Sequence, residues 1–146
     1  DIAYLNCVPD IVVMAPAHED ELADMMFTAM HQDRPAFIRY PRGNGEGIAV
    51  KEQPALIEVG KAEVLQNFSS NGQPKVAFLA LGPMRGIADE AIAELGADNI
   101  DAAIVNPRFT KPIDILSHLT TSLKAKTNIQ RLKASGAYAT KCGNSI

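Results

Sequence analysis

A short apolar run in this chain ends in two arginines, a proline and two glycines; it reads Ala36-Phe37-Ile38-Arg39-Tyr40-Pro41-Arg42-Gly43-Asn44-Gly45. The apolar and aromatic side chains suit a half-buried pleated surface, whereas Pro41 cannot donate to a central ladder. The stretch therefore predicts a strand that stops at a site. In open α/β sheets ligands bind outside the carboxyl ends of the strands, and a guanidinium there matches phosphate or carboxylate oxygens. Arg42 is the first candidate for anion recognition, although it could equally neutralise an acidic helix or cap a sheet edge.

The residues before this strand complete a first βαβ unit. Residues 11–15 form a continuous apolar run, typical of a strand buried on both faces in a parallel sheet. A helix is predicted over residues 19–31, because acidic residues crowd its first turns, where free amides favour negative charge. Its apolar stripe consists of Leu22, Met25, Met26, Ala29 and Met30. We expect the acidic run at residues 19–21 to be a solvated helix terminus.

A second βαβ unit is predicted further along the chain, over residues 75–105. Residues 43–58 lack periodicity and are interpreted as a loop leading to a linker. The elements expected after it are an edge strand (58–65), a buried strand (75–81), a helix (83–96), a strand (100–105), a loop (106–112) and a helix start at 112–114. The helix begins at Pro83, is closed by a left-handed cap at Gly96, and has an apolar face of Ile87, Ala91, Ile92 and Leu95.

The charge is unevenly distributed along the 146 residues. The net charge is −3, but no acidic residue follows Asp114, so the first 114 residues carry all 17 acidic groups against 9 of the 14 basic ones. The basic tail lacks aromatic interleaving, and we expect no nucleic-acid binding. No stretch approaches the roughly 20 apolar residues that span a bilayer, and no signal segment opens the chain. We expect a soluble, cytoplasmic protein in which Cys7 and Cys142 are unpaired thiols.

The remaining candidate side chains assemble no self-sufficient catalytic site. His18, His31 and His118 lack metal-ligand spacing, and no cysteine or paired carboxylate completes a metal site. His18 could face the same crevice as Arg42, but a helix-start histidine is the expected role. The glycines of residues 43–47 are interpreted as turn residues, because no helical pattern follows them as a phosphate loop would require. For Arg39 we expect a buried ion pair.

Six strings, taken in order, carry a family resemblance. They are Asp1-Ile2-Ala3-Tyr4-Leu5-Asn6-Cys7-Val8-Pro9, Val12-Val13-Met14-Ala15-Pro16, Glu19-Asp20-Glu21-Leu22, Arg39-Tyr40-Pro41-Arg42-Gly43-Asn44-Gly45, Val76-Ala77-Phe78-Leu79-Ala80-Leu81-Gly82 and Asn106-Pro107-Arg108-Phe109-Thr110-Lys111-Pro112-Ile113-Asp114. Together they resemble the 1-deoxy-D-xylulose-5-phosphate synthases, transketolase-like thiamine diphosphate enzymes. The resemblance covers residues 1 to about 115.

The resemblance implies an α/β fold in which the end of a transketolase-like pyrimidine-binding domain is followed by the start of a transketolase C-terminal domain. The expected bounds are 1–47 for the first domain, 48–60 for a linker, 61–115 for the second domain and 116–146 for a divergent tail. Both domains are expected to be partial, so the chain is expected to be a fragment that is inactive alone.

The family activity is a transferase reaction in isoprenoid precursor and thiamine biosynthesis. Pyruvate is decarboxylated on thiamine diphosphate, and the resulting carbanion adds to glyceraldehyde 3-phosphate. Arg42 matches the family arginine that contacts the acceptor's phosphate. The family's ligands for thiamine diphosphate and Mg²⁺ match no residue of this chain, so no catalytic, cofactor or metal residue is assigned. The resemblance also implies a homodimer for the full-length protein.

Two other interpretations stay open from the sequence. A free-standing interaction module or degenerate remnant would leave apolar faces exposed that await a partner. The strand, proline and acidic-helix pattern would also fit a transketolase fragment or the β subunit of a 2-oxo acid dehydrogenase.

Overall fold

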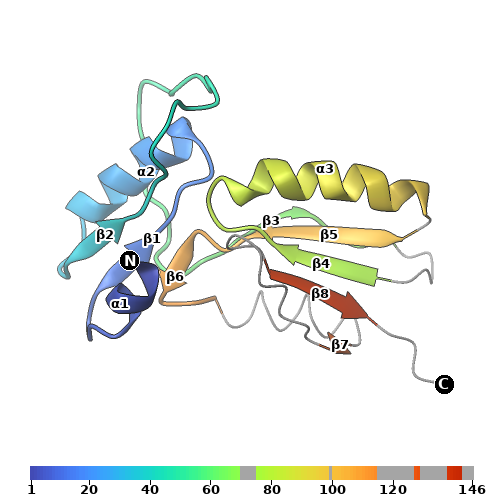
Figure 1. Ribbon diagram of the computed structural model, residues 1–146. Coiled ribbons are helices and arrows are strands. Elements are labelled where there is room, and N and C mark those ends of the chain that lie inside the picture. Colours follow the sequence, from blue (N-terminus) through green and yellow to red (C-terminus); the bar gives the residue numbers. More distant parts are fainter. Residues whose placement is uncertain (70–74, 99, 115–126, 129–137, 143–146) are drawn as a thin grey trace.

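The computed structural model describes residues 1–69, 75–98, 100–114, 127–128 and 138–142. They form two sheets, each built around a βαβ unit (Figure 1). The strand order is β2-β1-β6 in the first sheet and β3-β5-β4-β8-β7 in the second. In both sheets a parallel pair of strands is joined through a helix, which confirms the predicted α/β class.

The first unit follows a short helix, α1 (Ile2–Asn6), and consists of β1 (Val12–Met14), α2 (Glu19–Met30) and β2 (Ala36–Ile38). β1 and β2 pair in parallel, so the predicted βαβ unit is confirmed. The centre of this sheet is β1, whose side chains are fully buried as the continuous apolar run predicted. β2 covers the apolar start of the expected strand and ends at Ile38, after which Arg39 N still donates to Met14 O at 2.9 Å.

The predicted apolar stripe of α2 is only partly correct. Met25 is fully buried and Ala29 packs against the same core, but Met26 and Met30 are 55% and 82% exposed. Asp24 and Thr28 are buried instead. These two residues accept hydrogen bonds from main-chain amides of a later segment, and buried main-chain amides require polar acceptors.

That main chain is residues 47–57, which we call the strap. The strap has no regular secondary structure and lies along α2, where acceptors on the helix take its amides at four points. The donor–acceptor pairs are Gly47 N to Glu19 Oε1 (2.7 Å), Lys51 N to Asp20 Oδ1 (2.9 Å), Ala55 N to Asp24 Oδ1 (2.7 Å) and Ile57 N to Thr28 Oγ1 (2.9 Å). Lys51 Nζ also reaches Asp20 and Asp24. The expectation of a solvated acidic terminus is therefore wrong.

The expected loop at residues 106–112 contains a further strand, β6 (Phe109–Lys111). β6 pairs antiparallel with β1 and completes the first sheet. Phe109 is buried in the first core with Val12, Met14 and Met25. This strand depends on a long-range apolar contact, which a local sequence pattern does not reveal.

The second unit consists of β4 (Lys75–Leu79), α3 (Met84–Ala97) and β5 (Asp101–Asn106), and its parallel pairing confirms the second βαβ prediction. α3 runs along one face of the sheet (Figure 1). The predicted edge strand is present as β3 (Glu63–Gln66), which begins later than expected and pairs antiparallel with β5. β8 (Tyr138–Cys142) and β7 (Thr127–Asn128) extend the opposite side of the sheet.

Two details of α3 differ from the prediction. The residues that pack on the sheet are Met84, Ala88 and Ile92, each one turn from the next, whereas Ile87 is exposed. Gly96 lies inside the helix, which ends at Ala97 with Asp98 as its cap, so the expected glycine cap is wrong. The helix expected to start at residues 112–114 lies mostly outside the described residues.

Candidate functional site

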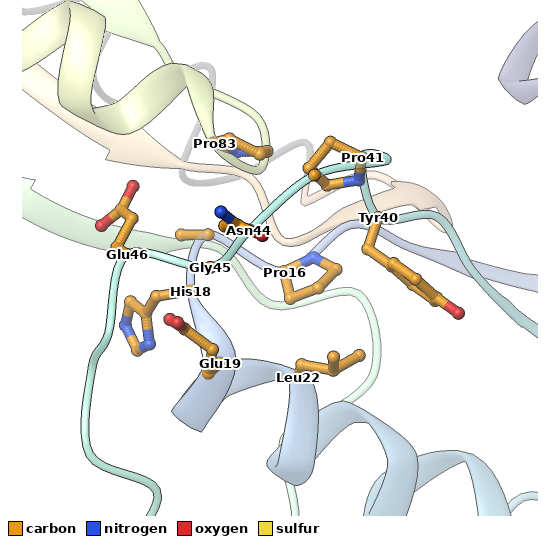
Figure 2. Close-up of a pocket in the computed structure, with 12 residues that line it drawn as sticks. Pro16, His18, Glu19, Leu22, Tyr40, Pro41, Asn44, Gly45, Glu46 and Pro83 are labelled. Carbon is orange, nitrogen blue, oxygen red and sulfur yellow. The ribbon is translucent and has the colours of Figure 1, made fainter.

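A pocket of about 200 Å³ opens where the two units meet. Three segments line it: the turn at residues 16–19 with Leu22, the loop at residues 40–46, and Pro83 at the start of α3 (Figure 2). The first segment follows β1 and the second follows β2. The pocket thus lies at the carboxyl ends of two parallel strands, where α/β sheets commonly bind ligands.

Arg42 is exposed in the loop after β2. It lies between two lining residues, Pro41 and Gly43, but its own side chain does not line the pocket. Gly43 and Gly47 have φ angles of +152° and +80°, and no helix follows them, which agrees with their interpretation as turn residues.

Arg42 differs from three other arginines in having no bonded partner in the described part of the chain. Arg39 pairs with Asp1 at 3.6 Å and Arg85 with Asp89 at 3.6 Å, while Arg108 is bonded to two glutamates. The Arg39 pair is partly exposed, so the expected burial of this ion pair is wrong. A guanidinium without a carboxylate partner keeps all its donors available for an anion.

The histidines take structural positions. His18 is the N-cap of α2, where Nδ1 accepts from Glu21 N at 3.3 Å, and it also lines the pocket. His31 caps the other end of the helix, with Nδ1 2.8 Å from Phe27 O and its ring packed on Phe27. His118 lies outside the described residues. In the described ranges no group of three histidine, cysteine or acidic side chains is arranged to hold a metal ion.

Glu19 brings a carboxylate to the wall of the pocket. Its Oε1 accepts from Gly47 N at 2.7 Å, and its Oε2 is buried with no bonded partner. The amides of Glu19 itself and of Gly47 hold the pKa of this carboxyl below its usual value. The charged form of Glu19 therefore links the loop that carries Arg42 to the first turn of α2.

Behind the pocket wall lies a buried polar network that the sequence did not reveal. Glu21 is 4% exposed and Asn106 is 2% exposed. The Glu21 carboxylate accepts from Ala17 N at 2.6 Å, Asn106 Nδ2 at 3.0 Å and Arg108 Nε at 2.7 Å. The terminal nitrogen of Arg108 continues to Glu63 Oε2 at 2.8 Å. Asn106 and Arg108 fall in a string that carries the family resemblance, but nothing local marks their partner as Glu21.

Comparison with protein families matches residues 60–129 to the transketolase C-terminal domain. Three curated 1-deoxy-D-xylulose-5-phosphate synthases illustrate the sequence similarity. That of Acidobacterium capsulatum is 47% identical over 127 residues, 86% of this chain and 20% of the relative. That of Methylacidiphilum infernorum is 49% identical over 78% of this chain and 17% of the relative. That of Anaeromyxobacter sp. strain K is 38% identical over 97% of this chain and 22% of the relative.

Among solved structures, the chain resembles one described as "Split gene transketolase, inactive beta4 tetramer". The TM-score is 0.71 at 25% identity, covering 86% of this chain and 40% of that one. None of the helices in the described ranges has the length and apolarity that crossing a bilayer requires. The chain spans about a fifth of the length of the curated relatives it matches. It has the expected transketolase-like α/β fold, and its resemblance to the 1-deoxy-D-xylulose-5-phosphate synthases is confirmed.

Proposed function

We propose that this chain supplies part of the acceptor-phosphate site of a 1-deoxy-D-xylulose-5-phosphate synthase. The reaction is the thiamine diphosphate-dependent condensation of pyruvate with glyceraldehyde 3-phosphate, and Arg42 binds the phosphate of the aldehyde. The observation that carries the proposal is the unpartnered, exposed Arg42 guanidinium beside a pocket at the strand ends.

The partners of the acidic residues in α2 support this role. If Arg42 served to neutralise that helix, it would be bonded to one of its carboxylates. Three of those carboxylates are bonded to other cations: Asp20 and Asp24 bind Lys51, and Glu21 binds Arg108. The fourth, Glu19, accepts from the Gly47 amide and does not contact Arg42. The helix therefore does not require Arg42 to neutralise its charge. The N–H donors of the Arg42 guanidinium are free to bind a phosphate, which has several acceptor oxygens.

We propose that thiamine diphosphate and Mg²⁺ are held by parts of such an enzyme other than the described residues, which offer no cluster for a metal ion. When bound, thiamine diphosphate supplies the carbon that attacks pyruvate. Because the chain spans about a fifth of its curated relatives, we propose that it is inactive alone. The proposal includes a cytoplasmic homodimer, a role in isoprenoid precursor and thiamine biosynthesis, and the domain bounds 1–47, 48–60, 61–115 and 116–146.

A titration of the chain with glyceraldehyde 3-phosphate, followed by amide NMR, tests the role of Arg42. Charge-assisted hydrogen bonds contribute about 1.5–3 kcal/mol each, so Arg42→Ala should weaken binding about 10- to 150-fold. Unphosphorylated glyceraldehyde should bind both proteins equally weakly.

Arg34 offers a matched control for this titration. It is also exposed and without a bonded partner in the described residues, but it precedes β2, at the amino end of the strand. Arg34→Ala should leave the affinity unchanged. Equal losses in the two variants, or none in Arg42→Ala, would refute the assignment.

The interaction-module interpretation has one observation in its favour. Met26 and Met30 lie one turn apart on α2 and are exposed, as a partner-binding face would require. Size-exclusion chromatography of the chain, with and without Met30→Lys, tests it. A concentration-dependent dimer that the variant abolishes would support this second function, whereas a monomer in both cases would contradict it.

A further inference from the structure

The pocket wall is held from behind by a carboxylate that does not line the pocket. Glu21 lies in the first turn of α2 and is almost completely buried. Its Oε2 accepts from the amide of Ala17, a lining residue, at 2.6 Å. This short bond joins the carboxylate directly to the main chain of the wall.

The other bonds of Glu21 cross to the second unit. Asn106 Nδ2 lies 3.0 and 3.2 Å from the two carboxylate oxygens, and Arg108 Nε lies 2.7 Å from Oε1. Asn106 is the last residue of β5, and Arg108 lies in the connection from β5 to β6. Glu21 therefore bonds at once to the pocket wall and to the end of a strand in the other sheet.

Main-chain contacts hold the same turn at two more points. Ala15 N donates to Arg108 O at 2.9 Å. Arg108 has a φ of +58°, a conformation uncommon for residues with a side chain. Gly82, just before α3, packs so closely that a Cβ built on it would lie 3.3 Å from Pro16 O. The turn at residues 15–18 is thus held by the β5–β6 connection at Ala15 and by the residue before Pro83 at Pro16.

We infer that Glu21 is a positioning residue. Its buried carboxylate, bonded to Asn106 and Arg108, sets where the turn at residues 15–18 stands relative to the second unit, and so sets the shape of the pocket between the turn, the Arg42 loop and Pro83. The inference rests on the proposed function only for the identity of the ligand, because the geometry of the turn can be measured without any ligand.

Glu21→Gln tests the inference, since glutamine keeps the shape of the side chain and removes its charge. We expect the Ala17 amide proton to shift upfield as its short bond weakens, and residual dipolar couplings to report a changed orientation of the two units. Asp24→Asn is the matched control. Asp24 is a buried carboxylate one turn away on the same helix, but it is bonded to the strap and not to the second unit. It should lower stability while leaving both signals in place.

A second variant covers the case in which Glu21→Gln does not fold. Glu21→Gln combined with Arg108→Met leaves no partly buried arginine facing a neutral glutamine, and replacement of both members of an ion pair is commonly tolerated. It should fold and still show the changed orientation. In the unmodified chain, the Ala17 amide should exchange with solvent more slowly than that of Gly47, whose acceptor Glu19 lies nearer the surface.

The outcomes separate the two proposals. If the unmodified chain does not bind glyceraldehyde 3-phosphate, the proposed function fails and the orientation measurements still decide the role of Glu21. If the chain binds, Glu21→Gln should weaken binding although it touches no ligand, and Asp24→Asn should not. An unchanged Ala17 signal and an unchanged orientation in a folded Glu21→Gln would overturn the inference.

Discussion

The hydrogen bond from the strap to Thr28 can be used to test whether the strap is held to the polar face of α2, a feature that the sequence did not predict. Thr28 is fully buried, and its Oγ1 accepts from Ile57 N at 2.9 Å. Thr28→Val preserves the volume and removes the acceptor, which leaves the Ile57 amide buried or forces the strap to part from the helix. A buried donor that loses its partner costs about 1–3 kcal/mol. We therefore expect the free energy of unfolding to fall by about that amount.

Thr28→Ser is the matched comparison, because it keeps the hydroxyl and removes one methyl group. Burying a methylene-sized group contributes about 0.8 kcal/mol, so serine should cost less than valine if the hydrogen bond dominates. Chemical denaturation measures both changes, and amide exchange of Ile57 localises them. If the Ile57 amide exchanges by local opening of the strap, losing about 1–3 kcal/mol makes this exchange about 5- to 150-fold faster in Thr28→Val than in the unmodified chain.

The relative stabilities of Thr28→Val and Thr28→Ser show whether the hydrogen bond or apolar packing makes Thr28 important. If Thr28→Val is as stable as the unmodified chain, the Ile57 amide does not depend on Thr28, and the strap is not held to α2 as the distances indicate. If serine costs more than valine, apolar packing and not the hydrogen bond makes Thr28 important. Either result would refute the explanation for the polar face of α2.

Two further predictions concern the close approach of the units and the response of the strap to acid. Gly82→Ala should destabilise the chain by about 1–2 kcal/mol in a thermal or chemical melt, because φ is +60° and Pro16 O crowds the new Cβ. Gly86→Ala, in the first turn of α3 where the new Cβ meets open space, should instead stabilise it by up to about 0.5–1 kcal/mol. The amide and ammonium of Lys51 lower the pKa of Asp20. The stability that Asp20 contributes is therefore present above its unfolded pKa and is lost as pH falls through the folded value, and the midpoint of the Lys51 amide shift in an NMR pH titration should lie below the usual aspartate pKa of 3.8.

The βαβ units could be predicted because their signals are local. A buried parallel strand reads as a continuous apolar run, as in β1, and an acidic first turn marks the start of a helix, as in α2. The pocket could be placed at the carboxyl ends of the strands for the same reason. Each of these inferences needs only residues that are neighbours in the sequence.

The incorrect predictions concern features that depend on residues far apart in the sequence. Which side of α2 is buried depends on the strap, whose residues follow about 30 positions later and whose amides bond Asp20, Asp24 and Thr28. β6 depends on pairing with β1, which lies about 97 residues earlier. The helical period of apolar residues therefore predicts burial of Met26 and Met30, although Asp24 and Thr28 are the residues that face the strap.

The acidic run at the start of α2 illustrates why the candidate site could be only half predicted. Its charge was consistent with solvation or with neutralisation by Arg42, and the sequence could not separate these alternatives. In the structure, consecutive carboxylates face different partners: Asp20 bonds the strap, and Glu21 bonds Asn106 at the end of β5. Since both carboxylates are bonded to other residues, neutralisation of Asp20 or Glu21 does not explain the position of Arg42, and the proposed phosphate contact stays a prediction for the binding titration.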